Sequence, residues 1–254
     1  MILSLMIAAA MALDDPPELP PSEFHPSDFL EVVEDGIVIN WTKMTLEVTD
    51  SARGSRTESK QEAVEQLARR RVGQGILAGA ANVAVTTDKT LADLQEEAEL
   101  ADPLRSRLDR WVAAESRYYA SGRVELVGVL FLQELLKPYT MNRARQAPEN
   151  PREPRYTGLV LDARGTHGRP AFAPRLLGDD STVLYDGTLW LDEALTRTPA
   201  IYVIDPAHRA AVMAGDSPMF IGAERADGGD FHLTAKDTLR FRTAMSQARL
   251  LGEG

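Results

Sequence analysis

The first half of the chain begins with a strand pattern that changes into a helix pattern. Apolar residues recur at every second position over residues 37–41 and again over 44–48, on either side of a short polar bend, which predicts a β-hairpin. Over residues 64–76 they recur at steps of three and four instead, which predicts an amphipathic helix. Ser59 and Glu62 have the spacing of a capping box, so we expect the helix to start there.

Three more elements complete this half. The pattern predicts a short strand over residues 82–86, a second helix over 103–113 and a long strand over 124–135. The last of these is a nearly continuous apolar run, which is typical of a central strand covered on at least one face. We therefore predict an α+β domain: a small antiparallel sheet with one long and one short helix packed on it.

The second half is richer in strands and turns. Its pattern predicts strands over residues 159–163, 171–176, 182–191 and 220–224, a short helix over 206–213, and a final helix. Thr234 and Asp237 provide the capping signal for that final helix. These elements predict a second strand-rich α+β domain.

Prolines divide the chain into its predicted parts. They are frequent just before residue 29 and again between residues 138 and 154, and proline fixes the backbone in a way that suits extended linkers. The expected organisation is a signal peptide at 1–12, a linker at 13–28, a first domain at 29–139, a linker at 140–155 and a second domain at 156–254.

The first thirteen residues, MILSLMIAAAMAL, are apolar apart from Ser4. The run is shorter than the about 20 residues that cross a bilayer. It matches the apolar core of a secretory signal, with Ala10-Met11-Ala12 as the cleavage site, although no Lys or Arg precedes it. The alternative is a strand or helix buried in the fold. We expect export to the periplasm, with no membrane span in the mature chain.

Composition argues against nucleic-acid binding and against sites built from cysteine. The formal net charge of −10 repels phosphate backbones, and we interpret Arg69-Arg70-Arg71 as a solvated helix face rather than a nucleic-acid patch. The chain has no cysteine, which excludes a disulfide framework, a thiolate metal site and a lipid-modified cysteine in this chain.

Candidate chemistry is sparse. None of the four histidines, His25, His167, His208 and His232, stands at metal-ligand spacing from another, and no nucleophile-elbow motif occurs. Asp230 and His232 fit either two ligands on one strand face or a turn aspartate beside a strand histidine. We predict no catalytic residues, no metal site and no cofactor.

The loop Arg164-Gly165-Thr166-His167-Gly168-Arg169 is the best candidate for a ligand site. Backbone amides in a glycine-bearing turn, flanked by two arginines, suit an anion. The loop lacks the Lys-Ser/Thr of a phosphate loop, and Pro170 follows it in place of a helix. Anion binding through Arg164, Gly165, His167 and Arg169 is therefore weighed against a structural loop.

Two long stretches resemble known bacterial proteins. The segments "INWTKMTLEVTDSARG", "EAVEQLARRRVGQGIL" and "ESRYYASGRVELVGVLFLQEL" resemble the twenty-kilodalton surface lipoprotein family and the N-terminal part of flagellar assembly protein T. The segments "YTGLVLDARGTHGRPAFAPRLL" and "SPMFIGAERADGGDFHLTAKDTLRF" look like the domain commonly appended to that unit in envelope proteins. The resemblance implies a structural or assembly role in the periplasm or at the outer membrane, and it offers no catalytic residues.

Three functional hypotheses follow. The first is a non-catalytic scaffold or assembly protein of a flagellar or other envelope complex, whose partners are envelope proteins such as flagellar ring components or further copies of the chain. The strand over 124–135 is expected to form a hairpin with residues 117–120, and an exposed edge strand there is the expected contact surface. The second is a periplasmic module that binds a small ligand or anion at the loop of residues 164–169. The third is an enzyme of unrecognised type.

Overall fold

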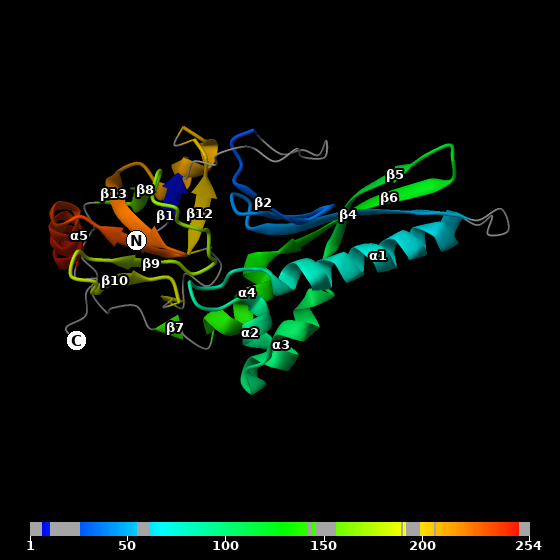
Figure 1. Ribbon diagram of the computed structural model, residues 1–254, viewed down its shortest axis with the longest axis horizontal. Coiled ribbons are helices and arrows are strands. Elements are labelled where there is room, and N and C mark those ends of the chain that lie inside the picture. The colour runs from blue at the N-terminus through cyan, green and yellow to red at the C-terminus, as the bar shows by residue number, and fades with distance from the viewer. Residues whose placement is uncertain are drawn as a thin grey trace.

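Among its described residues, the computed structural model has a five-stranded and a seven-stranded sheet that lie side by side, with helices packed on each (Figure 1). It describes residues 7–10, 26–54, 61–141, 144–145, 156–188, 190–191, 199–205 and 207–248. The α+β fold class predicted from the sequence is confirmed: an antiparallel sheet with helices comes first, and a second strand-rich domain follows it.

The first sheet is antiparallel throughout, in the order β2-β3-β4-β6-β5. Its strands are β2 (Leu30–Glu34), β3 (Ile37–Asn40), β4 (Thr45–Arg53), β5 (Val112–Tyr118) and β6 (Arg123–Phe131). The predicted hairpin corresponds to β3 and β4. The ladder between β4 and β6 runs unbroken from the pair Thr45 and Phe131 to the pair Arg53 and Arg123.

The long helix α1 (Gln61–Ala81) covers one face of this sheet. The predicted apolar stripe faces the core: Val64, Ala68, Val72 and Ile76 are buried, and Leu67 is partly buried. Helix and sheet approach closely at Gly79, where an added Cβ would lie only 2.6 Å from Ile37 Cγ2. We call β4, β5, β6 and α1 the arm, since they extend together away from the second sheet (Figure 1). Ser59 of the predicted capping box lies outside the described residues.

Three shorter helices, α2 (Leu91–Gln95), α3 (Ala98–Leu108) and α4 (Leu132–Met141), depart from the prediction. The apolar run at 124–135 is not one strand, because the chain turns from β6 into α4 after Phe131. The predicted helix at 103–113 starts earlier and ends at Leu108, and the chain continues into β5. The predicted strand at 82–86 is reduced to a single bridge between Ala84 and Thr90.

The second sheet is mixed, in the order β10-β9-β14-β13-β8-β1-β12. It contains β1 (Ile7–Ala10), β8 (Gly158–Asp162), β9 (Arg175–Leu177), β10 (Val183–Asp186), β12 (Ala200–Val203), β13 (Pro218–Asp227) and β14 (Asp230–Leu233). Helix α5 (Ala235–Ala248), a 3-10 helix η2 (Arg209–Ala214) and a two-stranded pair of β7 (Ala144–Arg145) with β11 (Trp190–Leu191) complete the fold. The predicted strand at 171–176 forms only from Arg175. The amides of Phe172 and Ala173 donate instead to the carbonyls of Ala84 and Val85 in the first domain.

Part of the predicted signal peptide takes a place in the second sheet. Strand β1 pairs in parallel with β8 on one side and with β12 on the other. This is the buried-strand alternative that the sequence left open. Cleavage after Ala12 would remove β1 and leave β8 and β12 without the strand between them, so export remains a prediction with a structural consequence.

Candidate functional site

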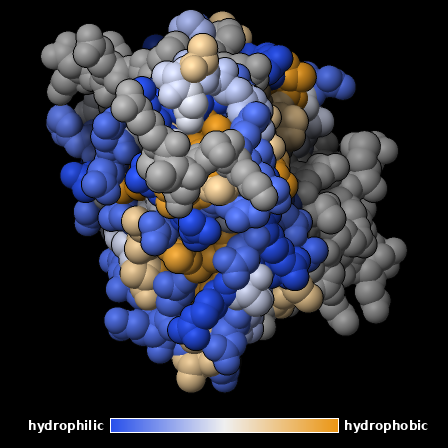
Figure 2. All heavy atoms as spheres, turned by 90° about the vertical axis from the view of Figure 1, so that its right-hand side faces the viewer, coloured by the Kyte–Doolittle hydropathy of each residue, from blue (hydrophilic) through white to orange (hydrophobic). Residues whose placement is uncertain are grey.

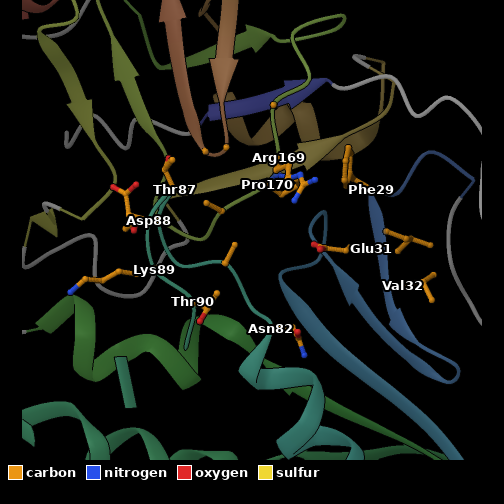
Figure 3. Close-up of a pocket in the computed structure, with 17 residues that line it drawn as sticks. Phe29, Glu31, Val32, Asn82, Thr87, Asp88, Lys89, Thr90, Arg169 and Pro170 are labelled. Carbon is orange, nitrogen blue, oxygen red and sulfur yellow. The ribbon is translucent and has the colours of Figure 1, made fainter. Parts of the chain in front are cut away.

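A cleft of about 640 Å³ opens between the two domains (Figure 3). Strand β2 forms one wall, and the chain between α1 and α2 forms another. The remaining wall comes from the second domain, at residues 168–171 and at the turn of Gly228 and Gly229. Ligand sites are often concave and lie at domain interfaces, so this cleft is the first place to look for binding.

A buried seam fixes the walls of the cleft relative to each other. Trp41 of the first domain and Tyr202 of β12 pack edge to face, with ring centroids 5.8 Å apart, and Trp41 is 0% exposed. The Thr42 hydroxyl donates to the Tyr202 carbonyl, and the Tyr202 amide donates to the Trp41 carbonyl at 3.3 Å. Because aromatic packing and hydrogen bonds act at the same place, these contacts fix the position of the two domains relative to each other.

The wall at residues 169–173 is anchored from both sides. The Tyr202 hydroxyl donates to the Ala171 carbonyl at 2.7 Å and accepts from the Ala171 amide at 3.1 Å. The amides of Phe172 and Ala173 donate to the carbonyls of Ala84 and Val85, at 2.9 and 2.8 Å. This hydrogen-bonding holds Arg169, at the start of the wall, in a defined position before any ligand arrives.

Arg169 is the cation of the cleft that has no counter-ion. Its guanidinium makes no ion pair or side-chain hydrogen bond within the part of the chain that the structure describes. The other charged groups are engaged: Lys89 pairs with Glu97 at 2.5 Å, Asp88 lies 3.6 Å from Arg175, and the Glu31 carboxylate accepts from the Trp41 indole at 2.7 Å. Among the described residues of the cleft, Arg169 is therefore a cation available to an anionic group, while the hydrogen-bonded Glu31 carboxylate keeps its negative charge on the β2 wall.

The structure separates the two arginines of the predicted anion loop. Arg164 turns to Asp162, with contacts of 2.9 and 2.6 Å, and this contact lowers the pKa of the Asp162 carboxyl. Gly165 has a φ of +79°, and His167 is exposed with a φ of 57°. Arg169 lies on the cleft. The four residues therefore do not converge on one anion, and Arg169 alone of the four belongs to the cleft.

The histidines that the structure describes do not assemble into a metal site. His208 is buried with Nε2 3.2 Å from Asp28 Oδ1, and His232 contacts Arg225 through Nδ1 at 2.9 Å. Asp230 is held by Arg175 and so does not share a ligand with His232. Across the described residues no group of three or more His, Cys, Asp or Glu is placed to hold a metal ion. His25 lies outside those residues.

A second candidate surface is the outer edge of β5. This strand is last in the sheet and pairs with β6 on one side only. The Tyr119 amide donates to the Arg123 carbonyl, so that pair is hydrogen-bonded, and alternation along the ladder makes the pairs at Ser116 and Tyr118 non-hydrogen-bonded. The backbone N–H and C=O groups of Ser116 and Tyr118 therefore point away from β6.

Two large apolar side chains near this edge are about half exposed. Val112 is 49% exposed and Tyr118 is 51% exposed. Seen from the free end of the arm, the surface is mainly hydrophilic with a smaller hydrophobic area showing between the polar residues (Figure 2). Arg117 bridges Glu115 and Glu125 across the strand pair, which places charge beside the edge.

Sequence reasoning found Arg169 but missed the cleft around it. The walls come from four segments that are far apart in the chain, and no local pattern connects them. Asp162, two positions before Arg164 in the sequence, was the one available signal that Arg164 is neutralised.

Comparison with known proteins informs the C-terminal part. Residues 158–254 match the family described as the second domain of Tp0624 from Treponema pallidum. The match starts at β8 and includes α5. It relates this part of the chain to a bacterial protein, and it does not reach the segments that resemble the surface lipoprotein family. The search of curated proteins found no match. No helix in the described residues is long and apolar enough to cross a membrane.

Proposed function

We propose that this chain is a non-catalytic assembly protein of the bacterial envelope that binds a partner polypeptide along the free edge of β5. That edge carries the proposal. It offers seven residues of strand with one neighbour, and unpaired backbone groups at a sheet edge accept another strand in many protein complexes. The partner is an extended segment of another envelope protein, with a flagellar ring component as the first candidate.

Three further observations support the proposal. The arm holds the edge away from the second domain (Figure 1). The apolar N-terminal run has the character of an export signal. The resemblance to envelope families and the match to a domain of a bacterial protein are in keeping with an envelope setting.

The test uses a proline in β5. Ser116→Pro removes an N–H that points away from β6, so it blocks strand addition while leaving the β5–β6 ladder bonded. Ser116→Val is the matched control, because it keeps the N–H and favours strand. Tagged wild type and both variants are crosslinked in envelopes of the native host, purified, and their partners identified by mass spectrometry.

We expect wild type and Ser116→Val to capture the same envelope protein and Ser116→Pro to lose it. Equal capture by the wild type and both variants would remove the edge as the contact surface. Recovery of only a second copy of this chain, lost with Ser116→Pro, would identify the partner as the chain itself. A protein that stays monomeric at high concentration and captures nothing contradicts the assembly role.

Export is tested separately by the intact mass of the protein purified from the host. Cleavage after Ala12 gives a chain that starts at Leu13 and lacks β1. A full-length chain in the cytosol would instead show that β1 stays in the second sheet, and it would overturn the envelope setting.

A second function, a periplasmic module that binds a small ligand or anion, is favoured by the cleft and its Arg169. Its site is not the whole predicted loop, because Arg164 is already paired with Asp162. Arg169→Glu should abolish anion binding, whereas Arg164→Glu should leave it nearly unchanged. Equal effects of the two substitutions would return the site to the loop.

A further inference from the structure

We infer that the interdomain cleft binds an extended peptide, which adds as a strand to β2 and places a carboxylate on Arg169. This inference rests on the second function proposed above, that the cleft is a ligand site, and it names the class of ligand. It is independent of the contact at β5, which lies at the opposite edge of the same sheet.

The free edge of β2 runs along the cleft. The Trp41 amide donates to the Phe29 carbonyl, so this pair is hydrogen-bonded and the following pair, Leu30 with Asn40, is not. The same alternation turns the N–H and C=O groups of Leu30 and Val32 away from β3. Both residues line the cleft, so these backbone groups face a ligand placed there.

The strand β12 leaves this edge free. Asp28 forms an antiparallel bridge with Val203 of β12, and the bond of this bridge runs from the Ile204 amide to the Ser27 carbonyl at 3.2 Å. Ser27 belongs to the same alternation as Phe29, whose carbonyl accepts from the Trp41 amide, so β12 approaches the chain on the β3 side. The outward groups of Leu30 and Val32 lie on the opposite side, and β12 does not occupy the edge that faces the cleft.

The opposite wall leaves room for a backbone. Gly168, Gly228 and Gly229 contribute no side chains, and Pro170 is compact. Packing explains two of these glycines, because a Cβ on Gly168 would lie 2.8 Å from Phe231 and a Cβ on Gly229 would lie 2.7 Å from Ala171. Glycine is common where another backbone must approach closely.

Arg169 fixes the charge of the ligand. Its guanidinium has five donors in a planar fork that matches a carboxylate, and the anchored wall holds its backbone, with the Arg169 amide donating to the Gly228 carbonyl at 2.9 Å. The carboxylate is either the C-terminus of the peptide or an acidic side chain. Val32, 42% exposed on β2, offers an apolar contact beside it.

A peptide fits the cleft better than a free anion does. Inorganic phosphate would use Arg169 and leave the outward carbonyls of Leu30 and Val32 to water. A peptide strand satisfies both the donors and the acceptors of the edge, and main-chain bonds of this kind supply affinity in β-strand addition.

The experiment measures binding of labelled peptides of about seven residues, in which valine and threonine alternate, by fluorescence anisotropy. Three pools are compared: one ending in glutamate with a free C-terminus, one with the same sequence amidated, and one ending in lysine amide. Inorganic phosphate is titrated separately. The protein variants are Val32→Pro with control Val32→Thr, and Arg169→Gln with control Arg164→Gln.

We expect the glutamate pool to bind and Val32→Pro to abolish its binding, while Val32→Thr retains it. Arg169→Gln should weaken binding by about tenfold or more, the effect of losing a charge-assisted contact, while Arg164→Gln changes little. Loss of affinity on amidation would assign the carboxylate to the C-terminus, and retained affinity would assign it to the side chain. Preference for the lysine pool would overturn the inference.

Hydrogen exchange on the wild-type protein covers the case in which Val32→Pro fails to fold. The amides of Leu30 and Val32 should become protected when the glutamate pool binds and stay unprotected with phosphate. Phosphate binding that depends on Arg169, without peptide binding, would overturn strand addition and keep the anion-binding function. Binding of neither probe would remove both.

Discussion

The two edges of the first sheet differ in what lies beyond them. Strand β5 has open surroundings on the arm, whereas β2 faces a wall contributed by the second domain. Both edges present outward backbone groups at alternate residues. The difference therefore comes from the second domain. It encloses the β2 edge in a cleft that contains Arg169 and leaves the β5 edge as an open surface.

This difference sets an expectation for selectivity. Hydrogen bonds formed in a confined, partly dry cleft are stronger than those on an open surface, and a single arginine adds a charge requirement. An open edge is limited by its side chains, here Val112 and Tyr118 with the ionic bridge of Arg117 beside them. We expect the β2 edge to select its ligand by charge and the β5 edge to select by side-chain fit.

The largest effect is expected from breaking the seam that walls the β2 edge. Trp41→Ala removes a fully buried indole that packs on Tyr202, and should lower the free energy of unfolding by about 3–5 kcal/mol in chemical denaturation. Tyr118→Ala, a half-exposed aromatic near the β5 edge, is the control and should cost less than about 1 kcal/mol. Similar losses for both would mean that the seam does not hold the domains together.

The next effect concerns the arm that carries the β5 edge. A Cβ on Gly128 of β6 would lie 2.3 Å from Val72 Cγ1 and 3.0 Å from the Trp111 ring. Gly128→Ala should therefore destabilise by about 1–3 kcal/mol through overpacking, measured by thermal and urea unfolding. Gly222→Ala is the control, because nothing lies within 4 Å of its added Cβ. A neutral Gly128→Ala would show that α1 is free to move off the sheet.

An effect of similar size separates the two edges directly. Tyr202→Phe removes the hydroxyl that bonds both the amide and the carbonyl of Ala171. The loss of stability should be about 1–3 kcal/mol, because buried backbone groups are left unpaired. Peptide binding at the cleft should weaken while capture at β5 is retained. Weakening of both would indicate that the two edges are coupled.

The smallest expected effect is a pH dependence inside the second domain. Burial, and then the charge of Arg225, lowers the pKa of His232, against the opposing influence of Asp230 and Asp227. The unfolded chain then binds this proton at higher pH than the folded chain, so stability is greatest above the ordinary imidazole pKa of about 6.5 and declines as the pH falls below it.

The check compares wild type with His232→Gln by urea unfolding at about pH 7.5 and about pH 5.5. Wild type should lose more stability than the variant on acidification. Equal losses would show that this histidine does not contribute to acid sensitivity. Peptide binding at either edge should be unaffected by the variant, since His232 lines neither of them.

Much of the fold could be predicted from local hydrophobic periodicity. The stripe from Val64 to Ile76 became the buried face of α1, because residues three and four apart share one side of a helix. The capping signal of Thr234 and Asp237 marks the start of α5, where the Asp237 amide donates to the Thr234 hydroxyl at 3.2 Å. The prediction of one strand over 124–135 was wrong because a continuous apolar segment fits a buried strand or a buried helix equally well. The hydrophobic pattern does not change at Leu132, where the strand gives way to α4.

The candidate site was predictable only in part. The loop of residues 164–169 led to Arg169, but its other wall, β2, lies more than a hundred residues earlier in the chain. Which arginine stays available depends on Asp162, and which edge is enclosed depends on how the two domains pack. The first had a local signal, since Asp162 stands two positions before Arg164; the second is a tertiary fact that no spacing encodes.

The most direct test of the central claim is site-specific photocrosslinking in envelopes of the native host. A photoreactive residue is placed at Ser116, and in a parallel variant at Thr49 of β4, which lies inside the sheet. The account predicts a crosslink from position 116 to an extended segment of an envelope protein, and none from position 49. Equal labelling from the two positions, or none from position 116, would contradict assembly through the β5 edge.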